Sequence, residues 1–129
     1  MNYLLDTCAL IALTNGSAEF SSRGRTVIAD PSAQIMVSVI TAAEISIKVG
    51  KGKYQLPMPV VDWVEGAVRQ HRLRLLPLEL HPASTAGKLP WHHSDPFDRI
   101  LIATAIERNL TIITSDKLIA QYSEVITLW

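Results

Sequence analysis

Four acidic residues far apart in the chain are of a type that could do chemistry together: Asp6, Glu44, Asp98 and Asp116. If they meet about 5 Å apart, each pair repels by roughly 3 kcal/mol at an effective dielectric near 20, so protons or cations must neutralise them. Carboxylate oxygens without clustered His or Cys favour hard ions such as Mg²⁺ or Mn²⁺. A cation held this way can activate water and stabilise charge on a phosphate, which favours phosphodiester hydrolysis.

The third of these acids lies at the start of the strongest predicted helix. Asp95 precedes Pro96, and a proline at the first helical position after an aspartate is typical of a helix start. Asp98 follows about one turn later, and the apolar residues from Ile100 to Ile106 predict a nearly continuous buried surface. We therefore expect Asp95 to cap the helix and Asp98 to belong to the acidic site.

Short apolar runs precede the other three acids. Tyr3–Leu5 ends at Asp6, Ile35–Val39 leads into the helix with Glu44, and Thr111–Thr114 comes just before Asp116. Strands that are apolar throughout and alternate with helices indicate a parallel sheet with both faces covered. The predicted fold is α/β, a three-layer α/β/α sandwich with a central, mainly parallel sheet. Ligands of such sheets bind beyond the carboxyl ends of the strands, where these acids lie.

Further elements complete this alternation. Thr41 with Glu44 forms a capping-box pattern, Asp62 could cap a helix reaching about Arg72, and Pro82 could start another. Asn109 is a candidate left-handed helix stop. The remaining expected elements are a helix over 8–13, a possible helix over 25–29, and strands over 73–78 and 125–128.

Length and composition predict one domain spanning residues 1–129. Lys+Arg and Asp+Glu both number 12, so any nucleic-acid contact must use a local basic patch rather than a global positive field. The single cysteine, Cys8, excludes an internal disulfide and is expected to be a small core residue. The start has no basic leader, and about 18 apolar residues never run together, so we expect a soluble, cytoplasmic protein without a membrane segment.

Each acid also has a purely structural interpretation. Glu44 could complete the capping box, and Asp98 or Asp116 could simply favour the positive end of a helix dipole. Asp6 is harder to explain this way, because a charge that ends a buried strand should have a partner. The coincidence of four positions favours a common site.

Several basic residues and histidines lie close in sequence to these acids. We expect His92 and His93 to be a polar loop pair rather than metal ligands. Arg99 is the better candidate for a functional cation, which could orient Asp95 or Asp98, or contact the substrate backbone. Lys48, with Lys51 and Lys53, is expected to lie on a solvated face.

The chain resembles the PIN-domain nucleases, specifically the VapC-type toxins of bacterial toxin–antitoxin pairs, over essentially its whole length. The resemblance is carried by Leu4-Leu5-Asp6-Thr7, Ala43-Glu44-Ile45, Asp95-Pro96-Phe97-Asp98-Arg99-Ile100-Leu101-Ile102-Ala103 and Thr114-Ser115-Asp116. It implies a Mg²⁺- or Mn²⁺-dependent endoribonuclease, usually a homodimer, held inactive by a cognate antitoxin. The implied catalytic and metal-binding residues are Asp6, Glu44, Asp98 and Asp116. Cys8 stands where many close relatives carry His.

Two other functions stay open at this point. One is a phosphatase or phosphotransferase on a related α/β sheet with Asp6 as covalent nucleophile, although no Asp-x-Asp follows the first strand. The other is a non-enzymatic PIN-fold protein that keeps an acidic pocket only to bind a partner or an ion. The RNA target and the number of ions are also open.

Overall fold

The computed structural model describes all residues from Met1 to Trp129. The strands are β1 (Asn2–Leu5), β2 (Gln34–Ser38), β3 (Arg74–Leu76), β4 (Thr111–Ile113) and β5 (Thr127–Leu128). The α-helices are α1 (Thr7–Thr14), α2 (Ser22–Ala29), α3 (Val39–Gly50), α4 (Val60–Gln70), α5 (Leu80–Thr85) and α6 (Pro96–Arg108), with 3₁₀ turns at Ala86–Lys88 and Ile119–Gln121. None of these helices is long and apolar enough to cross a membrane.

The five strands form one sheet in the order β3-β2-β1-β4-β5, and every neighbouring pair is parallel. The central strand β1 pairs with β2 through Leu5 and Val37, and with β4 through Leu5 and Ile113. Along the chain, β2 and β3 are therefore added on one side of β1, and β4 and β5 are then added on the other side. This reversal beside β1 is the switch point at which parallel α/β sheets usually bind ligands.

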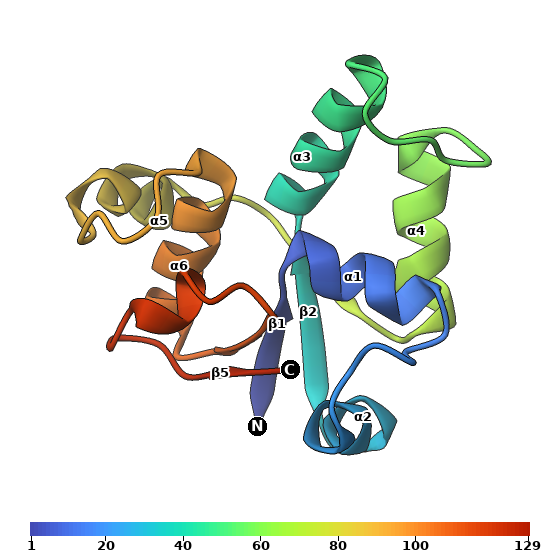
Figure 1. Cartoon of the computed structure of the whole chain (residues 1–129), viewed down its shortest axis with the longest axis horizontal. Helices are drawn as coiled ribbons and strands as arrows, with labels where there is room; N and C mark the ends of the chain where they lie inside the picture. Colours follow the sequence, from blue (N-terminus) through green and yellow to red (C-terminus); the bar gives the residue numbers. More distant parts are fainter.

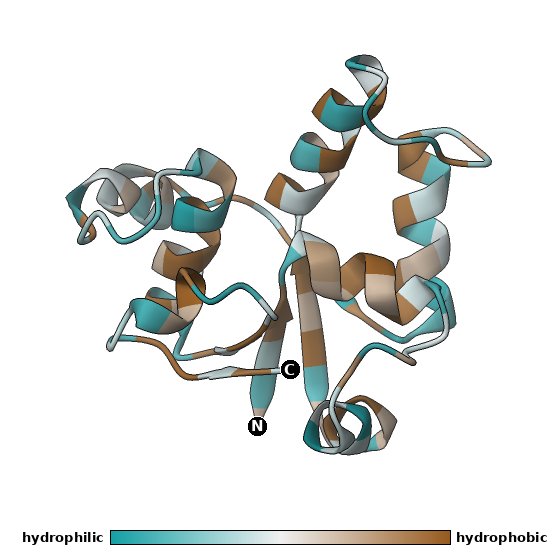
Figure 2. Ribbon diagram, viewed as in Figure 1, coloured by the Kyte–Doolittle hydropathy of each residue, from teal (hydrophilic) through white to brown (hydrophobic).

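Successive strand residues face opposite sides of the sheet and join two separate cores. Leu5, Val37 and Ile113 pack in one core with residues of α1 and α4, whereas Leu4 and Ile112 pack in the other with residues of α6. Figure 1 shows α1 and α4 grouped apart from α5 and α6, and Figure 2 shows apolar stretches on β2, α1 and α6. The predicted α/β/α sandwich is confirmed, and its sheet is entirely parallel.

Helix α6 begins and ends as the sequence predicts. The Asp95 side chain accepts hydrogen bonds from the backbone N–H groups of Phe97 (2.8 Å) and Asp98 (3.1 Å). Asn109 closes the helix in the left-handed region, at φ 54°. Asp95 is therefore the helix cap, which fixes where Asp98 lies.

The starts of three other helices differ from the expectation. The capping-box prediction for Thr41 and Glu44 is wrong, because β2 runs directly into α3 and Ser38 caps the helix through the N–H of Ile40. Asp62 lies inside the first turn of α4 rather than capping it, and Pro82 lies inside α5. The strands predicted over 73–78 and 125–128 are confirmed in shorter form, as β3 and β5.

The predicted burial is wrong for two side chains. Cys8 is exposed, because the inward face of α1 is formed by Ala9, Leu10 and Leu13. Ile106, in the last turn of α6, is also exposed.

Candidate metal centre

Asp6 is buried at the carboxyl end of the central strand, with 3% of its surface exposed. Its Oδ1 caps α1 by accepting the N–H of Ala9 (2.8 Å), and its Oδ2 accepts a short hydrogen bond from the hydroxyl of Thr114. Burial raises the pKa of Asp6, as do the charges of Asp116 and Glu44, while the two hydrogen bonds oppose this shift. The protein thus retains, at the switch point of the sheet, a carboxyl group whose charged form is disfavoured by burial.

Asp116 is joined to Asp6 through the turn that follows β4. The Thr114 hydroxyl donates to Asp6 and accepts the backbone N–H of Asp116 (2.9 Å). Asp116 Oδ1 accepts the N–H of Leu118 (2.8 Å), which leaves the second oxygen, Oδ2, available for other contacts. One short turn therefore positions two of the four acids.

Glu44, only 6% exposed, approaches the same region from α3. Its Oε1 accepts the hydroxyl of Thr7, the residue after Asp6, at 2.6 Å, and its Oε2 pairs with the Lys48 ammonium at 2.7 Å. The hydrogen bond to Glu44 is the main reason why the pKa of Lys48 is raised. Lys48 lies on a solvated face, as expected, and its ammonium also pairs with one member of the acidic set.

The expectation that His92 and His93 form a polar loop pair is wrong for His93. His93 is buried, and its Nε2 lies 2.8 Å from Asp98 Oδ2 and 3.0 Å from Asp116 Oδ2. His92 is exposed and packs edge-on against the ring of Tyr122. Local sequence does not distinguish the two histidines, because Asp116 is 23 residues from His93 in the chain.

Arg99 does not take the role expected of it. It is 3% exposed, and its guanidinium donates to the Tyr122 hydroxyl and to the carbonyl oxygens of Ala86, Leu89, Pro90 and His93. The Trp91 ring covers it, 3.5 Å from the guanidinium carbon. Arg99 is therefore not an ion-pair partner of Asp95 or Asp98. It holds the loop over residues 86–93 that carries His93.

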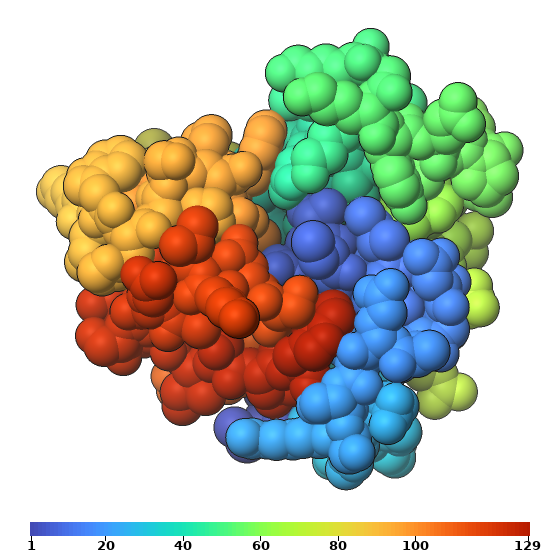
Figure 3. All heavy atoms as spheres, in the orientation of Figure 1, coloured from blue at the N-terminus to red at the C-terminus, as the bar shows by residue number.

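The segments that carry the four acids adjoin in the centre of the face shown in Figure 3, coloured blue, teal, orange and red-orange. His93 Nε2 and one carboxylate oxygen each of Asp98 and Asp116 lie within 4.8 Å of one another, a grouping that could hold a metal ion. Asp6 and Glu44 are tied to this grouping by Thr114 and Thr7. The oxygen-rich donor set fits a hard divalent cation.

Asp98 has the most perturbed carboxyl group of the set. Its pKa is raised from 3.8 to about 7, first by burial and then by the neighbouring charge of Asp95, with smaller contributions from Glu44 and Asp6. The contact with His93 acts in the opposite direction. A shift of this kind, caused by burial together with neighbouring charge, is typical of functional sites.

This shift predicts how the stability of the cation-free protein depends on pH. Between about pH 4 and 7 folded Asp98 keeps a proton that the unfolded chain releases, so raising the pH through this window lowers the free energy of unfolding. Asp6, whose pKa is also raised, acts in the same direction. Thermal unfolding in EDTA at several pH values should show a declining melting temperature that Mn²⁺ restores. The melting temperature of the Asp98→Asn variant should decline less with rising pH. An equally steep decline in this variant would contradict the assignment of the pH dependence to Asp98.

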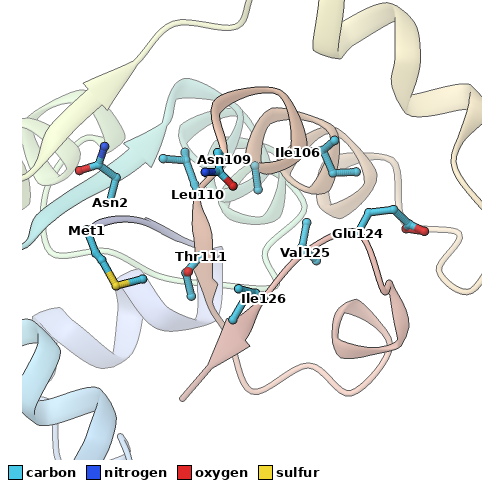
Figure 4. A pocket seen from close by; sticks show the side chains of 10 residues that line it. Met1, Asn2, Ile106, Asn109, Leu110, Thr111, Glu124, Val125 and Ile126 are labelled. Atoms are coloured by element: carbon cyan, nitrogen blue, oxygen red, sulfur yellow. The ribbon is translucent and has the colours of Figure 1, made fainter.

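A separate pocket lies at the opposite end of the sheet, where the strands begin (Figure 4). Its lining includes Asn2 at the start of β1, Thr111 at the start of β4, and Asn109. Glu124 is its only ionisable side chain. The chemistry-bearing groups are therefore concentrated at the carboxyl edge and not in this pocket.

The chain that forms this parallel sheet, with acids at its carboxyl edge, matches a known protein family. The family model of the PIN domain matches residues 3–125, so the chain belongs to the PIN domain family. It is 28% identical over 99 residues to the ribonuclease VapC22 of Mycobacterium tuberculosis, a match that covers 74% of this chain and 75% of that protein.

Solved structures share the fold at lower sequence identity. The VapBC structure from Salmonella typhimurium, bound to DNA, matches with a TM-score of 0.72 and 20% identity over 98% of this chain and 96% of that one. A toxin–antitoxin complex from Klebsiella pneumoniae matches with a TM-score of 0.67 and 24% identity, covering 98% of each chain.

Proposed function

We propose that this protein is a metal-dependent endoribonuclease that acts as the toxin of a toxin–antitoxin pair. The observation that carries this proposal is the hydrogen-bonded set of acids from four separate elements at the carboxyl edge of the sheet, where burial and crowding raise the pKa of Asp98 to about 7. Membership of the PIN domain family and similarity to a named ribonuclease support the same chemistry.

We assign Asp6, Glu44, Asp98 and Asp116 as the residues that hold Mg²⁺ or Mn²⁺. A bound cation of this kind supplies water activation and stabilises the negative charge that develops on a phosphate during hydrolysis. Asp6 and Glu44 are buried, whereas the side chains of Asp98 and Asp116 are 17% and 32% exposed, so a phosphate could approach the site from the side of Asp98 and Asp116. The same residues would thus bind the cation and place the scissile bond beside it.

The phosphatase alternative is disfavoured by the surroundings of Asp6. A covalent nucleophile needs a free oxygen with access to the phosphorus. Both carboxylate oxygens of Asp6 already accept hydrogen bonds, from Ala9 and Thr114, and the residue is 3% exposed. The burial and hydrogen bonding of Asp6 therefore disfavour a role as covalent nucleophile.

The proposed partners are RNA as substrate, a cognate antitoxin as inhibitor, and a second copy of the chain in a homodimer. VapBC and toxin–antitoxin complexes among the structural neighbours support an antitoxin partner. We further propose that residues 1–129 act as a single nuclease domain in the cytoplasm, where the RNA lies. The non-enzymatic alternative predicts partner binding without RNA cleavage.

Cleavage of RNA by purified protein, freed of any partner, tests this function. With a panel of structured RNAs we expect no cleavage in EDTA, cleavage in Mn²⁺ or Mg²⁺, and none with the Asp6→Asn variant. Glu124→Gln is the matched control, because it makes the same change of carboxylate to amide at the opposite end of the sheet. Cleavage that persists in EDTA or in folded Asp6→Asn would refute the proposal.

A further inference from the structure

His93 is the one non-acidic side chain that contacts two of the proposed metal-binding carboxylates. Its Nε2 lies 2.8 Å from Asp98 Oδ2 and 3.0 Å from Asp116 Oδ2, so both oxygens converge on a single nitrogen. The histidine is buried just ahead of α6. It therefore serves either as a metal ligand through Nε2 or as a hydrogen-bond donor between the two acids.

The other ring nitrogen distinguishes these two roles. The backbone N–H of Asp95 donates to His93 Nδ1 at 3.2 Å, so Nδ1 is an acceptor and carries no proton. In neutral imidazole the proton must then be on Nε2, which faces the carboxylates. A metal-binding histidine has the reverse arrangement, because its second nitrogen usually donates a proton to a carboxylate or carbonyl.

The surroundings of His93 hold the ring in this orientation. Its backbone N–H donates to the Tyr122 hydroxyl at 3.1 Å, and its carbonyl oxygen accepts from Arg99 at 2.9 Å. Asp95, which donates to Nδ1, is itself fixed as the cap of α6. The backbone on both sides of the imidazole is thus anchored, and the Nε2–H group has a defined direction.

We propose that His93 is a positioning residue whose Nε2–H group holds Asp98 and Asp116 at the separation needed for one cation, without itself binding the ion. The inference rests on the proposed function, because it assumes that these two acids bind a metal. Adjacent ligands of an octahedral Mg²⁺ ion lie about 3 Å apart, since each is 2.0–2.1 Å from the ion. By donating to both carboxylates, His93 holds the two oxygens within 4.8 Å of each other despite their mutual repulsion.

Mn²⁺ affinity, measured by calorimetry, tests the positioning role. Removal of a group that orients metal ligands typically weakens binding 10- to 100-fold. We expect His93→Ala to weaken Mn²⁺ binding about tenfold or more, and His93→Gln to stay within about threefold of the wild type, because its amide N–H can replace Nε2–H. His92→Ala, which changes the exposed neighbour, should bind like the wild type. Thermal melting of each variant checks that it is folded.

The outcomes separate this inference from the proposed function. If the wild type binds no Mn²⁺, the proposed function itself fails. If the wild type binds Mn²⁺ and folded His93→Ala binds it equally well or more tightly, only the positioning role is overturned. Equal losses in His93→Gln and His93→Ala would likewise overturn the donor role.

Spectroscopy of the wild type tests whether His93 coordinates the ion. In the metal-free protein, ¹⁵N NMR of the imidazole should show a protonated Nε2 and an unprotonated Nδ1. In the Mn²⁺-loaded protein, electron spin-echo spectra should show no coupling from a directly bound His93 nitrogen. Such a coupling would make His93 a ligand, and an Nε2 without a proton in the metal-free protein would remove the donor, so either result would overturn the inference.

Discussion

The Asp98→Asn variant should lose cation-dependent RNA cleavage by at least about a thousandfold while remaining folded. A metal ion in this kind of site supplies several kcal/mol of charge stabilisation, and about 4 kcal/mol corresponds to a factor of a thousand in rate. Asn has nearly the same shape as Asp but a neutral side chain that is a much weaker ligand. Rates of RNA cleavage at saturating Mn²⁺ measure the effect.

The matched control for this prediction is Asp95→Asn, the same substitution three residues earlier. Asp95 caps α6, and Asn is an equally good cap, so this variant should keep most of its activity. A loss in Asp95→Asn as large as in Asp98→Asn would show that negative charge in general is needed. Activity of folded Asp98→Asn within tenfold of the wild type would contradict the role of Asp98.

Arg99→Leu should lower the free energy of unfolding by at least about 3 kcal/mol. Loss of the guanidinium leaves the Tyr122 hydroxyl and the carbonyl groups of the loop over residues 86–93 without their donor. Each buried polar group left unsatisfied costs about 1–3 kcal/mol, although such costs do not add fully. Arg99→Lys should be nearly as harmful, since an ammonium cannot reach so many acceptors at once.

Urea denaturation of the variants measures this loss, with Arg108→Leu as the control. Arg108 is also on α6, but it pairs with Glu79 at the surface, where an ion pair contributes about 0–1 kcal/mol. A destabilisation of Arg99→Leu below 1 kcal/mol would contradict the structural role. Because the loop carries His93, folded Arg99→Lys should also bind Mn²⁺ more weakly than the wild type.

The sheet was predictable from sequence because its signals are local. Apolar runs such as Tyr3–Leu5 and Thr111–Thr114 cannot face water on either side, which favours a covered parallel sheet. The Asp95-Pro96 pair and Asn109 are strong local signals for a helix start and stop, and both are confirmed. The chemistry of a strand end likewise places Asp6 at the edge of the sheet before any coordinates are known.

The contacts that complete the site depend on residues distant in sequence and were missed. His93 meets Asp116 across 23 residues, and Arg99 binds carbonyl oxygens up to 13 residues away, which no helical or strand period relates to it. The capping-box prediction for Glu44 failed for a similar reason. The sequence from Thr41 to Glu44 does match a capping box. However, β2 continues into α3 without a turn, so the helix begins at Val39, before Thr41. Glu44 is then free to bond Thr7 and Lys48.

The most direct test of the central claim is an anomalous difference map from crystals of this protein soaked in Mn²⁺. We predict a manganese peak at the carboxyl edge of the sheet, within coordination distance of Asp98 and Asp116, with Asp6 and Glu44 as direct or water-bridged ligands. The peak should disappear in crystals of Asp98→Asn. Well-ordered crystals that show no peak at this edge at millimolar Mn²⁺, or a peak only elsewhere, would contradict the assignment of these acids as the metal centre.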